Sequence, residues 1–289
     1  MLASARLGTQ VGIAIKMATI LLTWELGGGL GHLVNLKPFA DDLSHRGHQV
    51  FAALRDSSRI GQVFTADKLI LVEAPVLRRR LASHLERPRT FAQILHNCGF
   101  GELPVLQSLV SAWVKLLRRV KPDLLVLDHS PAALLATRLL QLPRCLVGTG
   151  FFTPPLCSPL PDLRNGLRKP DDSAVGHEEL VLRNINTVLA QWGQSSLSQV
   201  ADLYHQVERN YFTTFAELDH YGIRADSRYV GSWTIPATAK PEWPGPPGKR
   251  IFAYLKPVPQ IEMLFSAIRR INAAALVYCH GIPSATVSQ

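Results

Sequence analysis

The sequence has few cysteines, and no two of them form a recognisable pair. The chain has four, Cys98, Cys145, Cys157 and Cys279, without a C-x-x-C motif. Its ten histidines likewise show no spacing typical of metal ligands. We therefore expect reduced, structural cysteines, no metal site and a cytoplasmic location.

Long hydrophobic runs are also lacking. No stretch reaches the roughly 18 apolar residues that a membrane span needs, because Lys16 breaks the most apolar N-terminal segment. The first sixteen residues have neither the long apolar core nor the cleavage site of a signal peptide, so we expect an N-terminal extension over 1–16, with Met17 as a candidate start. With 289 residues, 47% of them hydrophobic, the chain can bury the core of one or two domains.

Acidic residues are outnumbered by basic ones. The chain has 31 Lys and Arg against 22 Asp and Glu, a formal charge of +9, with basic clusters over 78–89 and 115–121. Neither cluster has interleaved aromatic residues or a recognised nucleic-acid motif, so we expect no nucleic-acid partner. Most of these charges are expected on solvated faces, and the remainder suits peripheral contact with an anionic membrane or a phosphorylated ligand.

The most informative segment is a glycine-rich turn between a predicted strand over 18–23 and a predicted helix over 33–46. The turn holds Gly27, Gly28, Gly29 and Gly31. Glycine permits positive φ and lets a ligand approach the backbone closely. His32 follows directly, at the carboxyl end of the sheet, where open α/β folds bind ligands. A helix N-terminus favours the neutral imidazole there, which is able to act as a base.

A second strand also ends in a residue capable of chemistry. The apolar run over 123–128 ends in Asp128. Because the carboxyl ends of parallel strands share one edge of a sheet, Asp128 and His32 point into the same crevice and could meet there, while the sequence leaves open whether they touch. A later strand leads into a loop with Phe151 and Phe152, which we expect near the same crevice, either lining a ligand pocket or packing.

The order of the predicted elements is that of a parallel sheet covered by helices, an α/β fold. Strands are predicted over 18–23, 49–54, 69–72, 123–128, 144–148, 211–215 and 227–230. Helices are predicted over 33–46, 89–97, 103–120, 132–140 and 178–204. Proline, glycine and charged residues predict an exposed excursion over 158–176.

A proline-rich segment over 235–248 predicts a linker and a domain boundary. Beyond it, strand, helix and strand patterns over 249–255, 261–273 and 275–279 open another α/β unit. Some forty residues cannot bury a doubly wound sheet alone. We therefore expect the second domain, over 249–289, to be truncated.

Four segments together resemble bacterial GT-B glycosyltransferases, especially the UDP-glucuronosyl and UDP-glucosyl transferases and the macrolide glycosyltransferases. They are G-G-G-L-G-H, P-D-L-L-V-L-D-H-S-P, G-T-G-F-F-T-P-P, and R-Y-V-G-S-W with K-R-I-F-A-Y-L-K-P after the linker. The resemblance implies a Rossmann-like acceptor-binding domain over 17–234 and the first β-α-β fragment of a nucleotide-sugar-binding domain over 249–289. It also implies inverting, metal-independent hexosyl transfer without a cofactor, using a nucleotide-sugar, expected to be a UDP-sugar, as co-substrate.

In the family pattern, His32 falls on the catalytic histidine and Asp128 on the aspartate that pairs with it. A positioned base contributes about 10² to 10⁴ in rate, and the acid would hold the ring in one tautomer and stabilise the imidazolium. The family's glycine-rich diphosphate loop and its sugar-binding acid and glutamine have no counterpart up to Gln289. We therefore expect little or no transfer from this chain alone.

Two alternatives remain open. One is a non-catalytic acceptor-binding or partner module that keeps the fold without transfer. The other is a dinucleotide-dependent oxidoreductase, since Asp56 lies at about the ribose-binding distance of 20 residues, although His32 replaces the third glycine of the fingerprint. The acceptor is expected to be an apolar hydroxylated small molecule, a sterol or a lipid.

Overall fold

The computed structural model describes residues 16–58, 60–64, 69–164, 170–225, 227–233, 242–244, 248–271, 273–279 and 281–282. The chain divides into two compact units, Met1–Ile235 and Pro236–Gln289. The extension predicted over 1–16, apart from Lys16, and most of the linker predicted over 235–248 lie outside the described residues.

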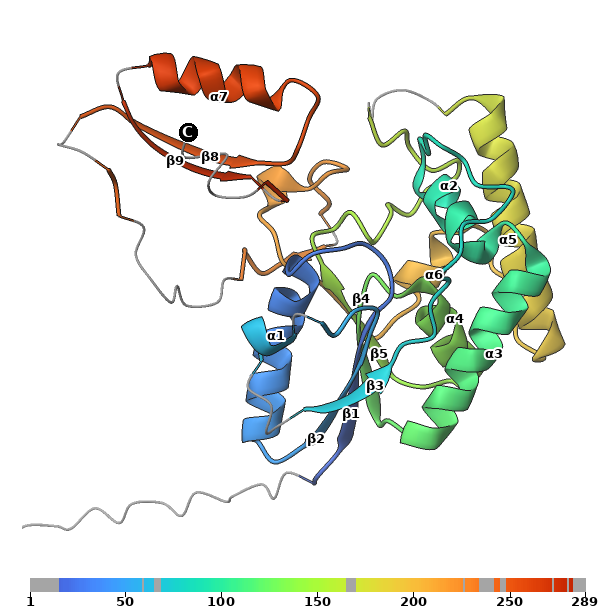
Figure 1. Cartoon of the computed structure of the whole chain (residues 1–289). Coiled ribbons are helices and arrows are strands. Elements are labelled where there is room, and N and C mark those ends of the chain that lie inside the picture. Colours follow the sequence, from blue (N-terminus) through green and yellow to red (C-terminus); the bar gives the residue numbers. More distant parts are fainter. Residues whose placement is uncertain are drawn as a thin grey trace, which may run out of the picture. The chain divides into compact units, whose positions relative to one another are not determined.

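The first unit is built on a seven-stranded sheet in the order β3-β2-β1-β4-β5-β6-β7, with every neighbouring pair parallel (Figure 1). The strands are β1 (Thr19–Trp24), β2 (Gln49–Leu54), β3 (Ile70–Glu73), β4 (Leu124–Asp128), β5 (Arg144–Gly148), β6 (Arg209–Phe212) and β7 (Arg228–Tyr229). The predicted α/β fold with a parallel sheet is confirmed. The strand order changes direction between β1 and β4, and such a switch point is where open α/β sheets bind ligands.

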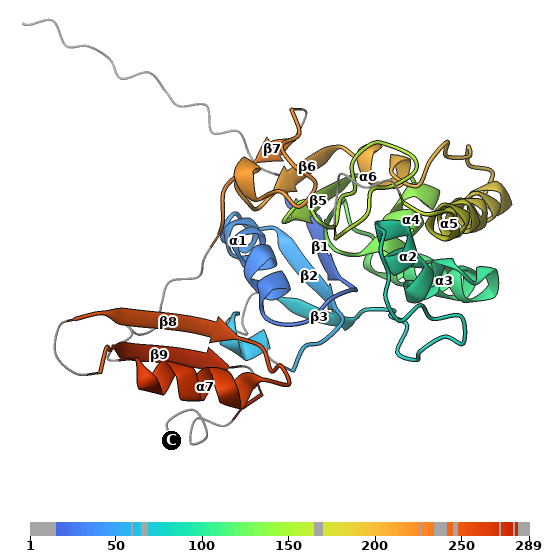
Figure 2. The same ribbon diagram turned by 90° about the horizontal axis from the view of Figure 1, so that it is seen from above.

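Helices cover both faces of this sheet. They are α1 (Gly31–His45), α2 (Phe91–Leu95), α3 (Leu103–Val120), α4 (Pro131–Leu139), α5 (Asp172–Gln191) and α6 (Asp202–His205), with a π-helical turn over His96–Phe100 and 3₁₀ turns over Ile60–Gln62 and Ala216–Leu218. Figure 2 shows α1 on one side of the strands and α2 to α5 on the other. No helix among the described residues is both long enough and apolar enough to cross a membrane.

Two hydrophobic cores fill the space between the sheet and its helices. Leu21 and Leu125 belong to the core under α3 to α5, which also holds the fully buried Trp113. Leu22 and Val126, the next residues along the same strands, belong to the core under α1. Successive strand residues point to opposite faces, so the continuous apolar runs of β1 and β4 supply both cores at once.

The helix predicted over 178–204 is wrong at both ends. Helix α5 begins at Asp172, because the Asp171 side chain caps it by accepting a hydrogen bond from Ala174 N at 2.9 Å. It ends at Gln191, shortly before Gly193, which has a φ of +64°. The excursion predicted over 158–176 is correspondingly shorter.

The basic cluster over 78–89 is not simply a solvated face. The Arg89 side chain, 38% exposed, binds the fully buried carboxylate of Asp162, with Nε to Oδ2 at 2.8 Å. The contact joins the segment before α2 to the loop before α5. Because the Asp162 carboxylate is removed from water, loss of Arg89 would leave a buried charge without its partner, which is costly. Arg89 therefore has a structural role that its place in a charged run does not reveal.

The second unit is a single β-α-β crossover. Strands β8 (Arg250–Leu255) and β9 (Ala274–Cys279) pair in parallel, and α7 (Ile261–Arg270) connects them. Ile261 and Phe265 pack under α7 with Cys279. On the other face, Phe252 and Tyr254 are 68% and 69% exposed.

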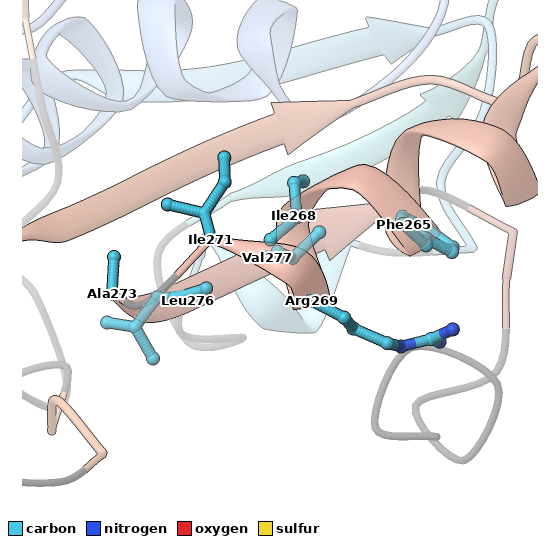
Figure 3. Close-up of a pocket in the computed structure, with 8 residues that line it drawn as sticks. Phe265, Ile268, Arg269, Ile271, Ala273, Leu276 and Val277 are labelled. Carbon is cyan, nitrogen blue, oxygen red and sulfur yellow. The ribbon is translucent and has the colours of Figure 1, made fainter.

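A hollow of about 330 Å³ lies at the end of α7 in the second unit. Figure 3 shows it lined by residues such as Phe265, Ile268, Ile271, Leu276 and Val277. Most of these side chains are apolar, and Arg269 is the charged one among them. The second unit thus has apolar surface beside its helix as well as on the uncovered sheet face.

Candidate active site

His32 and Asp128 meet at the carboxyl edge of the sheet. Asp128 ends β4, directly beside Trp24 at the end of β1, and His32 lies in the first turn of α1. His32 Nδ1 is 3.1 Å from Asp128 Oδ1, although the two residues are 96 positions apart. The His32 residue is 8% exposed and Asp128 is fully buried. The structure thus shows a contact that the sequence left open, while the catalytic role of the pair stays a prediction.

The second oxygen of Asp128 is also held. Asn35 Nδ2 donates a hydrogen bond to Asp128 Oδ2 at 3.4 Å, and Thr213 Oγ1 donates to Asn35 Oδ1 at 3.3 Å. Burial raises the pKa of Asp128, and its hydrogen bonds to His32 and Asn35 oppose that rise. The carboxyl group is therefore fixed in orientation by two neighbours on α1.

The sequence interpretation missed Asn35 and Thr213. Asn35 lies three positions after His32, so both face the same side of a helix, and this spacing was a usable signal. Thr213 follows β6, and it lies near the site because of the position of β6 in the sheet. No pattern in the neighbouring sequence reveals that position.

The glycine turn covers the free edge of the His32 ring. Gly27 has a φ of +85°, and a Cβ added to it would lie 2.5 Å from His32 Nε2. Gly29 also has positive φ, whereas Gly28 and Gly31 do not, and a Cβ on any of these three would meet open space. Among the described residues, Nε2 has no hydrogen-bond partner. Nε2 therefore points toward an exposed turn where side chains are absent.

Aromatic rings lie beside the imidazole. Trp24 stacks on His32 with centroids 5.0 Å apart and planes 18° apart, and Phe152 lies 5.3 Å away on a tilt of 33°. His129 in turn stacks on Phe152 at 3.9 Å and 16°. Phe152, a residue expected near the crevice, thus lies beside His32, and whether it lines a ligand pocket stays a prediction.

Phe151 has different neighbours. Its ring makes edge contacts with Phe91 at 6.1 Å and with Phe152 at 5.6 Å, and it packs against the larger core. The Tyr221 hydroxyl donates a hydrogen bond to the Phe151 carbonyl at 3.3 Å. Phe151 therefore supports the loop of Phe152, which lies next to His32.

His129 is a buried histidine that the sequence interpretation did not weigh. Its φ is +46°, and its carbonyl accepts a hydrogen bond from Leu26 N at 3.1 Å, which ties the glycine turn to the end of β4. Neither ring nitrogen has a hydrogen-bond partner within the part of the chain that the structure describes. Burial, and secondarily the nearby His32, lower the pKa of His129 to about 3. His129 is therefore neutral at physiological pH.

Glu25 is a second buried group that the sequence did not reveal. Its carboxyl oxygens accept hydrogen bonds from the backbone N–H groups of Ala132 and Ala133, in the first turn of α4. Burial raises the pKa of Glu25 to about 8, against the lowering effect of these two bonds. Glu25 thereby joins the loop after β1 to the helix after β4.

No metal-binding cluster is found within the part of the chain that the structure describes, where no three His, Cys, Asp or Glu side chains gather closely enough to hold an ion. The cysteines within the described ranges are all free. The chemistry available at the site is that of a histidine and a buried carboxyl group.

Comparison with known proteins reveals the fold but no close relative. No protein-family model and no curated protein matches this sequence. The glycosyltransferase SnogD from Streptomyces nogalater matches with a TM-score of 0.55 at 18% identity, over 94% of this chain and 68% of its own. The calicheamicin glycosyltransferase CalG4 matches with 0.56 at 17%, over 95% and 68%. The spinosyn rhamnosyltransferase SpnG matches with 0.54 at 14%, over 91% and 66%.

These matches confirm the resemblance to the GT-B glycosyltransferase fold that the sequence motifs predicted. At identities of 14% to 18% the likeness is one of fold. This chain spans about two thirds of the length of each of these proteins.

Proposed function

We propose that this chain is the acceptor-binding part of a glycosyltransferase, which moves a hexosyl group from a nucleotide-sugar to an acceptor hydroxyl. The observation that carries the proposal is the 3.1 Å contact between His32 Nδ1 and Asp128 Oδ1, on a GT-B-like fold. This contact leaves Nε2 directed at an exposed glycine turn. A histidine held by a buried carboxyl group at a switch point is suited to general-base catalysis.

In the proposed reaction, His32 Nε2 removes the proton of the acceptor hydroxyl. The hydroxyl oxygen attacks the anomeric carbon, and the bond from that carbon to the diphosphate oxygen breaks. The nucleoside diphosphate leaves with the electron pair, and attack from the opposite face inverts the anomeric centre. No metal is required for the proton transfer, because the imidazole is itself the base.

Asp128 has a positioning role in this proposal. It accepts a hydrogen bond from Nδ1–H, so that Nε2 carries the lone pair, and it stabilises the imidazolium that forms. Asn35 holds the other carboxyl oxygen and prevents rotation of the group. The stacked ring of Trp24 and the tilted ring of Phe152 limit rotation of the imidazole.

The donor and acceptor are proposed by analogy. SpnG is known in complex with thymidine diphosphate and with spinosyn aglycone. We propose a uridine or thymidine diphosphate sugar as donor, an apolar hydroxylated molecule as acceptor, and no further cofactor. Because the second unit has only β8, α7 and β9 among its described residues, we propose that donor binding requires further polypeptide.

The binding-module alternative is favoured by one observation, the uncovered sheet face of the second unit with Phe252 and Tyr254. The oxidoreductase alternative is less well supported. The His32 ring lies against Gly27 in the glycine turn, where a dinucleotide fingerprint leaves room for a pyrophosphate.

The test is a transfer assay on this chain extended by a donor domain from a structural neighbour, with a panel of nucleotide-sugars and hydroxylated acceptors. His32→Ala and Asp128→Asn are each expected to lower the rate by at least about a hundredfold. The matched control is His45→Ala, which removes an exposed histidine at the other end of α1 and should leave the rate unchanged.

Two outcomes would contradict the proposal. One is a folded extended chain that stays inactive with every donor and acceptor while still binding an acceptor, which would support the binding module. The other is transfer that His32→Ala and His45→Ala affect equally.

A further inference from the structure

A groove of about 590 Å³ lies between the segment that follows β3 and the start of α3. Its apolar lining includes Val76, Leu77, Val105 and Leu109, and its charged side chains are Arg78 and Arg79. No acidic side chain lines it. Ligand sites of about 300 to 1,000 Å³ are typical for small molecules, so the groove has the size of a binding site.

Gly99 lies beneath the apolar part of the groove. It has a φ of +104°, and a Cβ on it would lie 3.0 Å from Leu109 and from Val105 and 3.8 Å from Leu77. Three lining side chains therefore converge above one glycine. The side chains of Leu77, Val105 and Leu109 therefore lie close together and form an apolar part of the groove lining.

The three consecutive arginines at this groove differ in their partners. Arg78 pairs with Glu73 at 2.7 Å, and Arg80 pairs with Glu86. Arg79, between them, has no ion-pair partner among the described residues. The groove thus has one exposed guanidinium group available to an anion from outside the protein.

A smaller hollow of about 330 Å³ adjoins the groove and shares Val76 and Arg78 with it. Arg55 and Asp56 complete its lining. Because Asp56 brings a carboxyl group into this hollow, the hollow is less suited to an anion than the groove is.

We propose that this groove binds a single-chain anionic amphiphile, namely a long-chain carboxylate. The hydrocarbon chain lies along Leu77 and Leu109, and the carboxylate pairs with the guanidinium of Arg79. An apolar lining with one unpaired cation is complementary to such a molecule, and a planar guanidinium donates two parallel hydrogen bonds to a carboxylate. Binding of this amphiphile does not rest on the proposed function.

The test is calorimetric titration of the full chain with dodecanoate below its micelle concentration, compared with dodecanol and with acetate. Dodecanoate is expected to bind more tightly than either. Arg79→Gln should weaken dodecanoate binding about three- to tenfold, because exposed charge pairs contribute modestly, and should leave dodecanol binding unchanged. Leu109→Ser should weaken both dodecanoate and dodecanol.

The matched control is Arg87→Gln, which removes an exposed arginine of the same cluster that does not line the groove. It should leave dodecanoate binding unchanged. His32→Ala should also leave it unchanged, so the groove can be tested even if transfer is never observed. Equal effects of Arg79→Gln and Arg87→Gln, equal affinity for dodecanol and dodecanoate, or binding only to phosphatidylglycerol vesicles would each overturn the proposal.

Discussion

At the scale of single residues, the His32 ring is closely surrounded. Trp24 and Phe152 lie beside it, and Asp128 holds Nδ1. The remaining edge, at Nε2, faces Gly27, where even one added carbon has no room.

We expect Gly27→Ala to impair both stability and transfer. An alanine at a φ of +85° is strained by about 1 to 2 kcal/mol, and its Cβ would have to displace the imidazole from a separation of 2.5 Å. A displacement of about 1 Å can cost a hundredfold in rate. Urea unfolding and the transfer rate of the extended chain measure the two effects.

Gly28→Ala is the matched control. Gly28 belongs to the same exposed turn, but its φ is not positive and a Cβ there meets nothing within 4 Å. It should leave stability and rate close to those of the parent. If Gly28→Ala has the same effect as Gly27→Ala, the turn requires glycine for a reason other than the His32 ring.

Some residues of the site can be found from the sequence around them, and others cannot. His32 and Asp128 could be chosen from the sequence because Asp128 ends one apolar strand and His32 opens the helix after another, and parallel strands bring such ends to one edge of the sheet. Glu25 was not predictable, since its partners are the backbone N–H groups of Ala132 and Ala133, more than 100 residues away. His129 was passed over because its burial depends on Phe152 and not on its neighbours in sequence.

At the scale of elements, several strands and the amphipathic helix α3 were predictable in detail. The bounds expected for 49–54, 103–120 and 144–148 agree with β2, α3 and β5. In these segments, uninterrupted apolar runs and regular helical spacing define both the type of element and its ends. The predicted helix over 178–204 extended too far because apolar residues continue after Gln191. In the structure these residues form a loop and a short helix, α6, and pack against the same core.

Glu25 makes the junction between the β1 loop and α4 sensitive to pH. Its pKa is about 8 in the folded protein, against 4.5 ordinarily. At a pH between 4.5 and about 8, Glu25 therefore keeps its proton in the folded protein, whereas the unfolded chain releases it. We therefore expect the free energy of unfolding to fall as pH rises from about 5 to 8, by up to about 4 kcal/mol from this group.

Urea unfolding of the parent and of Glu25→Gln at pH 5, 6.5 and 8 measures this effect. The variant should show a flatter dependence on pH, whatever its absolute stability, because its amide does not titrate. Glu86→Gln, at an exposed carboxylate, is the control and should leave the slope as in the parent. Parallel curves for Glu25→Gln and the parent would show that the Glu25 carboxyl group is ionised throughout this range.

At the scale of the whole molecule, the two units differ in how completely they bury their apolar surface. The first has helices on both faces of its sheet and two extensive cores. The second has one helix on one face, and its buried core consists of Ile261, Phe265 and Cys279. A unit of this size hides too little surface to be stable alone, so the stability of the chain resides in the first unit.

We therefore expect a chain shortened to end at Ile235 to fold as the full chain does. Trp233, which packs on Phe39 at 5.3 Å, is retained, and both large cores lie within the first unit. Its free energy of unfolding should agree with that of the full chain within about 1 kcal/mol, as for any change remote from the cores. Binding of an apolar dye such as ANS should decrease, because the exposed face with Phe252 and Tyr254 is removed.

Loss of cooperative unfolding in the shortened chain would mean that the second unit contributes to the stability of the first. The full chain would then be the smallest form suitable for the dodecanoate titration.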